Sequence, residues 1–93
     1  FGLIGEIKAQ PGKGDELARY LMEGSRKMPG NLVYLVAQSQ TDPDSIWITE
    51  AWRTKTDHLA SLKLPQVQAA IAKARPIIAG FGHRVETRPL DLG

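Results

Sequence analysis

The sequence predicts an α+β fold in which one antiparallel sheet is packed against helices. Two observations support this prediction. Apolar residues recur at every second position in four segments and at every third or fourth position in the segments between them, in the order strand, helix, strand, strand, helix, strand. Proline, glycine and aspartate separate these segments, as turns require. The 93 residues, of which 42% are apolar, suit a single domain over residues 1–93 with a polar tail from about residue 89.

The first strand and the first helix occupy the N-terminal third of the chain. Phe1 to Ala9 alternate as a strand does, and Gln10-Pro11-Gly12 breaks the strand. From Asp15 to Met28 the period becomes that of a helix, which Pro29-Gly30 ends. The apolar stripe of this helix consists of Leu17, Tyr20, Leu21, Gly24 and Met28.

The next two strands form a hairpin. They run from Leu32 to Gln40 and from Ser45 to Arg53. The connection between them, Thr41-Asp42-Pro43-Asp44, is short, polar and rich in turn-forming residues. A connection of this length joins antiparallel neighbours, so the two strands are predicted to pair.

Two helical segments follow the hairpin. Thr54 and Asp57 have the spacing of an N-cap and its third helical residue, which predicts a short helix that contains His58. Pro65 suits the first position of a second helix, and Pro76 is expected to kink or end it. The apolar stripe of the second helix consists of Val67, Ala70, Ile71, Ala74 and Ile78.

Two glycines are expected to close this helical region before the last strand. Gly80 and Gly82 interrupt the helical pattern, and the strand is predicted from His83 to Arg88. The complete order of elements corresponds to two split βαβ units, which is the ferredoxin-like βαββαβ plan.

Both faces of the hairpin strands are apolar. In the first of the two strands one side carries Leu32, Tyr34 and Val36 and the other carries Val33, Leu35 and Ala37. In the second, one side carries Ile46, Ile48 and Trp52 and the other carries Trp47, Thr49 and Ala51. Helices can cover only one of these faces, and a half-exposed sheet would alternate apolar with polar residues. We therefore expect a homodimer through the sheet faces, with Trp47 in the interface, although a different partner protein would satisfy the same argument.

Composition excludes several classes of function. A net charge of +2 with scattered basic residues disfavours nucleic acid as a partner. The chain has no cysteine, which excludes disulfides and thiolate chemistry and fits a reducing cytoplasm. No apolar run approaches the ~20 residues that a membrane-spanning helix needs, so a soluble cytoplasmic protein without membrane contact is expected.

Three motifs, in this order and spacing, resemble the antibiotic biosynthesis monooxygenase family, whose members include small quinol monooxygenases. They are Met28-Pro29-Gly30-Asn31 with Tyr34, then Glu50-Ala51-Trp52-Arg53-Thr54, then a helix that leads to Leu64-Pro65-Gln66-Val67. The resemblance extends from Leu3 to Arg88. It implies a dimeric α+β barrel, with a pocket in each protomer between the sheet and its own helices.

The family resemblance also implies an activity. Relatives oxygenate quinols or polyketide phenols with O2 and without a cofactor, and others on this scaffold degrade haem or isomerise sugar phosphates. We therefore expect a monooxygenase that oxidises a small quinol or phenolic aromatic, with no metal or flavin. The alternatives are a non-catalytic dimeric module that binds a small molecule, and an isomerase or a haem-degrading enzyme.

His58 is the candidate base of such a reaction. Many members of the family carry a histidine nine residues after the tryptophan of Glu-x-Trp, but here that position holds Ser61. His58 lies three residues earlier, on a similar side of the helix, and a histidine can take a phenolic proton near neutral pH. The competing interpretation is a packed or exposed helix residue, and the absence of the usual histidine slightly favours the binding module.

Three further residues are candidates for the catalytic pocket. Trp52 could exclude water, stack on an aromatic ring and donate from its indole, although a lone strand tryptophan is more often a core residue. Tyr34 and Asn31 could orient a substrate or donate to reduced oxygen. Asn31 is also an ordinary turn residue, and the usual residue at its position in the family is often cysteine.

The expected substrate-binding residues are Gly5, Glu50, Ser61 and Leu62. Glu50 shares a face with apolar neighbours, so it should either be paired, for which Arg84 or Arg53 is preferred, or have a shifted pKa. Gly5 leaves a gap in the first strand that would admit a ligand or mark a bulge. The two histidines are 25 positions apart with no carboxylate at a familiar ligand spacing, so no metal site is expected.

Overall fold

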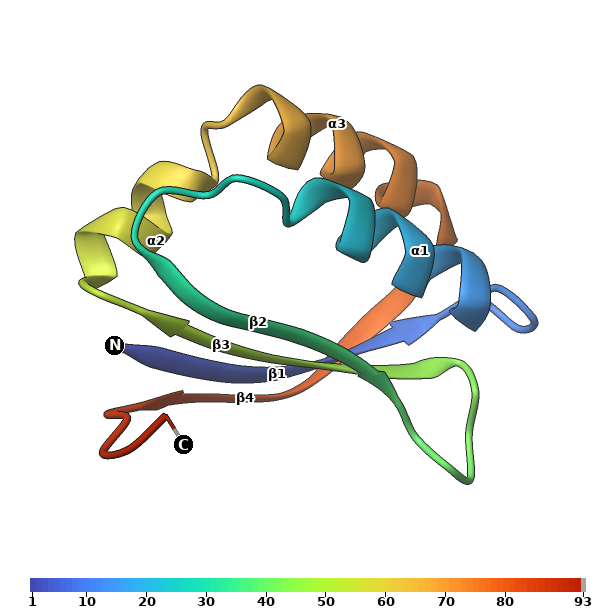
Figure 1. The fold of residues 1–93 in the computed structure, drawn as a ribbon. Coiled ribbons are helices and arrows are strands. Elements are labelled where there is room, and N and C mark those ends of the chain that lie inside the picture. Colours follow the sequence, from blue (N-terminus) through green and yellow to red (C-terminus); the bar gives the residue numbers. More distant parts are fainter. Residues whose placement is uncertain (93) are drawn as a thin grey trace.

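The computed structural model describes residues 1–92 and shows one layer of helices on one antiparallel sheet (Figure 1). The sheet has the strand order β2-β3-β1-β4, which confirms the predicted ferredoxin-like α+β fold. Its strands are β1 (Gly2–Ala9), β2 (Asn31–Gln38), β3 (Ser45–Trp52) and β4 (Ile78–Thr87). The helices are α1 (Gly14–Gly24), α2 (Lys55–Ser61), α3 (Pro65–Ala74) and the short 3-10 helix η1 (Arg75–Ile77). Gly93, which ends the predicted domain and tail, lies outside the described residues.

The first helix ends earlier than predicted. Helix α1 stops at Gly24 rather than Met28, and the chain then turns through Lys27, which has a positive φ of 54°. Gly30 has a φ of 80°, and the side chain of Asp57 occupies the place where a Cβ at Gly30 would lie. This sharp turn into β2 explains why a glycine is required there and why the helix cannot continue to it.

The last strand begins five residues earlier than predicted. Helix α3 ends at Ala74, and η1 connects it to β4, so Pro76 lies just after the helix as expected. Ile78 is the first residue of β4 and not the last of the helical stripe. Gly82 lies within the strand beside a register shift, where a Cβ would collide with the carboxylate of Glu6. The glycines therefore mark a β-bulge rather than the end of the preceding element.

The helices pack on the sheet around a small apolar core. Leu17 of α1 and Ile46 of β3 are completely buried, and Ala9 and Ala74 complete this cluster. Gly24 of α1 lies so close to α3 that a Cβ there would collide with Ala70. The close approach of α1 and α3 fixes the helical layer above the sheet.

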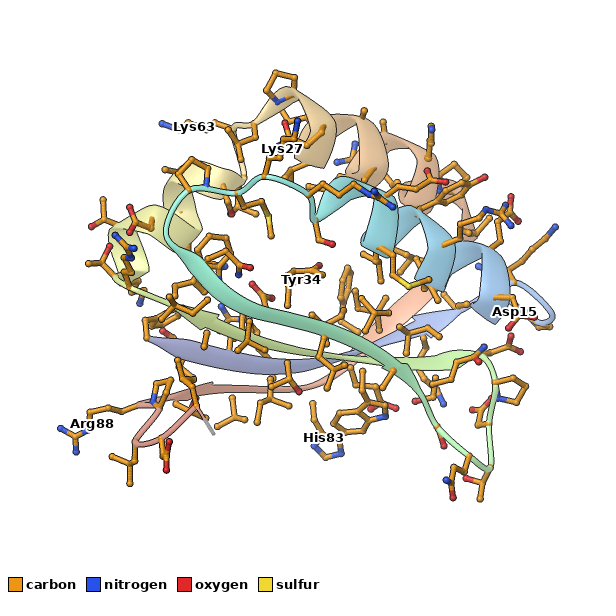
Figure 2. All side chains as sticks on the ribbon, viewed as in Figure 1. Asp15, Lys27, Tyr34, Lys63, His83 and Arg88 are labelled. Carbon is orange, nitrogen blue, oxygen red and sulfur yellow. The ribbon has the colours of Figure 1, made fainter. Side chains whose placement is uncertain are left out.

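The face of the sheet opposite the helices is uncovered. In Figure 2, Tyr34 points from the sheet toward the helices, whereas His83 lies on the opposite side. The imidazole of His83 stacks on the indole of Trp47, with 6.0 Å between ring centroids. Leu35 and Val85, which belong to this face, have 56% and 50% of their surface exposed. An exposed apolar sheet face of this kind is typical of a surface that pairs with another protein surface.

One residue of the hairpin departs from the predicted alternation. A register shift between Asn31 and Val33 makes Leu32 an extra residue of β2. Leu32 is 47% exposed and lines a shallow hollow with Arg53 and Pro89, so it does not share the face of Tyr34. No helix among residues 1–92 is long and apolar enough to cross a membrane.

Substitution of Leu17 tests the core. Leu17→Ala should lower the free energy of unfolding by about 2–5 kcal/mol, because it leaves a cavity between α1 and the sheet. Met22 lies on the same helix with 49% of its surface exposed, so Met22→Ala should change this free energy by only about 0.5 kcal/mol. Urea denaturation of both variants at one protein concentration measures the difference. Equal losses would show that α1 does not anchor the core through Leu17.

Candidate functional site

A cavity of about 190 Å³ lies between the sheet and the helical layer. The sheet side of its wall comes from β1, β2 and β3, and the other side comes from all three α-helices and the turns that follow α1 and α2. The lining residues are Ile7, Leu21, Gly24, Ser25, Met28, Tyr34, Ile48, Glu50, Trp52, His58, Ser61, Leu62, Val67, Ala70 and Ile71. Most of the wall is apolar, and three titratable side chains, Tyr34, Glu50 and His58, interrupt it.

Strand alternation and helix capping place the polar residues of this cavity. Glu50 and Trp52 lie two residues apart on the helix-facing side of β3, and Tyr34 is opposite Glu50 in the register of β2. The Oγ1 atom of Thr54 accepts a hydrogen bond of 3.0 Å from the backbone N–H of Asp57, which confirms the predicted cap. The cap fixes the start of α2 and thereby turns His58 toward the sheet.

The buried ring of His58 has an unpartnered nitrogen. His58 is only 8% exposed, and its ring makes an edge contact with Trp52 at 5.5 Å between centroids. Phe1 lies on it at 5.4 Å. The Nδ1 atom is buried, and no described residue gives it a hydrogen bond. Because buried polar atoms are normally satisfied, this nitrogen marks a place for a ligand or a water molecule.

Glu50 is held by a tryptophan rather than by an arginine. The indole Nε1 of Trp52 donates to Oε1 of Glu50 at 2.9 Å. Within residues 1–92 no ion pair joins Glu50 to Arg84 or Arg53, so the predicted pairing is wrong; Arg84 instead pairs with Glu86 at 3.7 Å. Burial raises the pKa of Glu50, and the Trp52 hydrogen bond and the positive charge of Arg84 oppose this rise. Trp52 therefore has no indole proton left to donate to a substrate.

Tyr34 is the neutral hydrogen-bond donor of the cavity. Burial and the negative charge of Glu50 raise the pKa of Tyr34 far above its usual value. The phenol therefore keeps its proton at any physiological pH. A hydroxyl in this state can donate to an oxygen atom of a bound ligand.

The serine at the family histidine position uses its proton within the helix. The Oγ atom of Ser61 donates to the carbonyl oxygen of His58 at 2.6 Å, and Ser61 is 5% exposed. Ser61 can still accept a hydrogen bond from a ligand, but it cannot donate one without breaking this contact. Leu62, which follows α2, contributes apolar surface to the same wall.

Two of the predicted site residues lie outside this cavity. The Nδ2 atom of Asn31 donates to the carbonyl oxygens of Val33 at 3.0 Å and Ala51 at 3.4 Å, and these bonds hold the bulge in β2. Gly5 lines an adjoining hollow of about 230 Å³ together with Arg84 and Glu50. A Cβ at Gly5 would meet only a backbone oxygen at 3.9 Å, so the gap predicted at this position is present.

The apolar residues that α1, the turn after it and α3 contribute were not predicted as site residues. Leu21, Met28, Val67 and Ile71 line the cavity beside the polar group. The helical periodicity identifies all four as members of apolar stripes, which is the signal for a sheet-facing position. Periodicity does not distinguish a residue that fills the core from one that borders a cavity. Among the described residues, no three His, Asp or Glu side chains are grouped to hold a metal ion.

Comparisons with known proteins point to one family. The family model described as antibiotic biosynthesis monooxygenase matches residues 1–73. A crystal structure from Chloroflexus aurantiacus J-10-fl, named for this family, is 52% identical with a TM-score of 0.94, over 97% of this chain and 92% of that one. Structures from Bacteroides thetaiotaomicron (18% identity, TM-score 0.84, 97% and 89% covered) and Deinococcus radiodurans (23%, 0.77, 97% and 94%) share the fold. No curated protein matches the chain.

The raised pKa of Glu50 predicts how stability depends on pH. Glu50 takes up its proton more readily in the folded protein, so folding loses stability as the pH rises from below 4.5 through its folded pKa. The Glu50→Gln side chain cannot ionise and keeps an oxygen that accepts from Trp52. The unfolding free energy of this variant relative to the wild type should therefore increase as the pH rises through this range.

Glu86→Gln provides the opposite control. The hydrogen bond from Lys55 lowers the pKa of Glu86, so this variant should become less stable relative to the wild type as the pH rises. Urea denaturation at several pH values measures both effects. A pH-independent effect of Glu50→Gln would show that burial does not perturb this carboxyl group.

Proposed function

This chain belongs to the antibiotic biosynthesis monooxygenase family, as the sequence motifs predicted, and we propose that it oxidises a small quinol or phenolic aromatic with O2 and without a metal or flavin. The observation that carries the proposal is the buried, unpartnered Nδ1 of His58 at the wall of an apolar cavity. A phenolic hydroxyl is a donor on an otherwise apolar ring. The hydroxyl can donate to the imidazole nitrogen, and the ring can pack against the apolar walls of the cavity.

The proposed reaction begins with a proton transfer. Nδ1 of His58 accepts the proton of the bound hydroxyl, with the other ring nitrogen carrying the hydrogen of the neutral imidazole. The resulting phenolate gives one electron to O2, and the two radicals then combine at a ring carbon. Tyr34 keeps its proton and donates to the oxygen that becomes negative. The apolar walls exclude water and strengthen these electrostatic contacts.

The proposed reaction balances without an external reductant. A quinol and O2 give a hydroxyquinone and water, so that one oxygen atom enters the ring and the other leaves as water. The substrate supplies all four electrons, two from the ring C–H bond that becomes C–OH and two from the quinol that becomes a quinone. The protons leave through His58 and the product water. Glu50, held by Trp52, contributes a second acceptor, a carboxyl oxygen, for orienting the ring.

A non-catalytic binding module is the second candidate. Ser61 stands where many relatives have a histidine, and its proton is committed to the carbonyl of His58. The same cavity could then bind a phenol without turnover. Oxygen uptake in the presence of a bound phenol separates the two functions.

We also propose that the protein is a homodimer through the uncovered sheet face. Leu35, Val85 and Trp47 lie on this face, and no helix of the described residues covers it (Figure 1). Sheet-to-sheet packing would remove this apolar surface from water. Each protomer would retain its own cavity, because the cavity lies on the helical side.

Removal of the imidazole tests the catalytic proposal. His58→Ala should lower turnover by about 10²- to 10⁴-fold, the range for loss of a general base. His83 lies on the other side of the sheet (Figure 2), so His83→Ala should leave turnover unchanged. The measurement is protein-dependent oxygen uptake with a panel of hydroquinones and naphthohydroquinones, with superoxide dismutase present to suppress spontaneous oxidation. Unchanged turnover of His58→Ala would remove His58 from the mechanism.

Sedimentation of the intact protein tests the dimer. At micromolar concentration the wild type should sediment at twice the chain mass of 10.2 kDa. Leu35→Lys places a charge on the uncovered face and should produce monomers, whereas Leu59→Lys, at an equally exposed position of α2, should remain dimeric. A wild type that sediments only as a monomer would contradict the proposal.

A further inference from the structure

A second, larger hollow lies beside the candidate site. It measures about 520 Å³ and is bounded by the end of α3, the inner side of α1 and the first residues of β4. Its lining consists of Ile7, Leu21, Ile71, Ala74, Arg75, Ile78, Ala79, Gly80 and Phe81. Arg75 is the one ionisable side chain among these lining residues. The rest of the surface is suited to an apolar occupant.

The hollow and the cavity share part of their walls. Ile7, Leu21 and Ile71 line both spaces, so a ligand in the cavity meets the hollow directly beyond these three side chains. The cavity alone, at about 190 Å³, is smaller than the ~300–1,000 Å³ of ordinary small-molecule sites, whereas the hollow of about 520 Å³ falls within that range. The cavity therefore holds a ring and little else, and a larger substrate must extend into the hollow.

The other neighbour of the cavity has a different chemistry. The hollow of about 230 Å³ near Gly5 is bordered by the charged side chains of Glu6, Glu50 and Arg84. Several ionisable side chains therefore border this smaller hollow, whereas Arg75 alone does so at the larger one.

Phe81 borders the apolar hollow with an exposed ring. It pairs with Ile7 in the sheet and so lies on the helix-facing side, yet 76% of its surface is exposed. The register shift after Phe81 marks the bulge that separates it from Arg84. An aromatic side chain exposed at the rim of an apolar hollow gains contact area when an apolar ligand lies against it.

We propose that this hollow binds an alkyl or prenyl-like side chain carried by the phenolic ring, so that the substrates are phenols or quinols with an apolar tail. The proposal rests on the proposed function for the position of the ring. The hydroxyl points to His58, and the tail passes between Leu21 and Ile71 toward Phe81. Two observations favour this occupant. The hollow shares a wall with the cavity, and Arg75 is the one ionisable side chain among the residues that line the hollow.

Binding of redox-inert alkylphenols tests the tail site without turnover. Isothermal titration calorimetry of the wild type with 4-alkylphenols, from methyl to octyl, should show affinity rising about fourfold for each methylene that enters the hollow, and then levelling off. Phe81→Ser should flatten this dependence for the longer chains and leave methylphenol affinity unchanged. Leu59→Ser, at an exposed position that lines neither space, should keep the wild-type dependence.

The outcomes separate this proposal from the proposed function. Affinity that does not depend on alkyl chain length would overturn the tail site. The same dependence on chain length in Phe81→Ser and Leu59→Ser would also overturn it. If a second copy of the chain fills the hollow, the affinity will likewise not depend on chain length. Chain-length dependence without oxygen uptake would support the tail site and contradict the oxygenase. Oxygen uptake without chain-length dependence would support the oxygenase and contradict the tail site.

Discussion

Packing of every helix on one face of the sheet is the constraint from which the site follows. The helical layer contacts the sheet tightly at two places, around Leu17 and Ile46 at one end and around Trp52 and His58 at the other. Gly24 lets α1 and α3 approach each other closely above the sheet. Between the two contacts the layers do not meet completely, and the cavity occupies the remaining space. The uncovered face follows from the same arrangement, since no helix within residues 1–92 remains to cover it.

The cavity combines low polarity with a small set of proton-bearing groups. Burial keeps Tyr34 protonated and raises the pKa of Glu50, while Trp52 stabilises the ionised form of Glu50. His58 is the one residue in the described chain with a buried side-chain nitrogen or oxygen that lacks a hydrogen bond. One donor, one restrained carboxyl group and the ring of His58 therefore line an apolar space. This arrangement suits a phenol better than a charged or highly polar ligand.

The sequence could predict those features that depend on periodicity and local capping. Alternation along β3 placed Glu50 and Trp52 on the same face of the strand, and the Thr54 cap positioned α2 with His58. Periodicity could not place the start of β4, because a glycine such as Gly82 marks either the end of an element or a bulge. The Leu32 bulge and the partner of Glu50 depend on contacts across the fold. The apolar hollow beside Phe81 depends on how completely two layers meet, which no local pattern records.

The proposed mechanism depends on a hydrogen bond from a phenolic hydroxyl to Nδ1 of His58. Nitrogen-15 NMR of the imidazole during titration with a redox-inert phenol tests this contact directly, because the chemical shift of a ring nitrogen responds strongly to a hydrogen bond at that atom. We expect a saturable shift at Nδ1 of His58, with no matching change at His83 on the opposite side of the sheet. Saturable binding of the phenol with an unchanged His58 signal would contradict it.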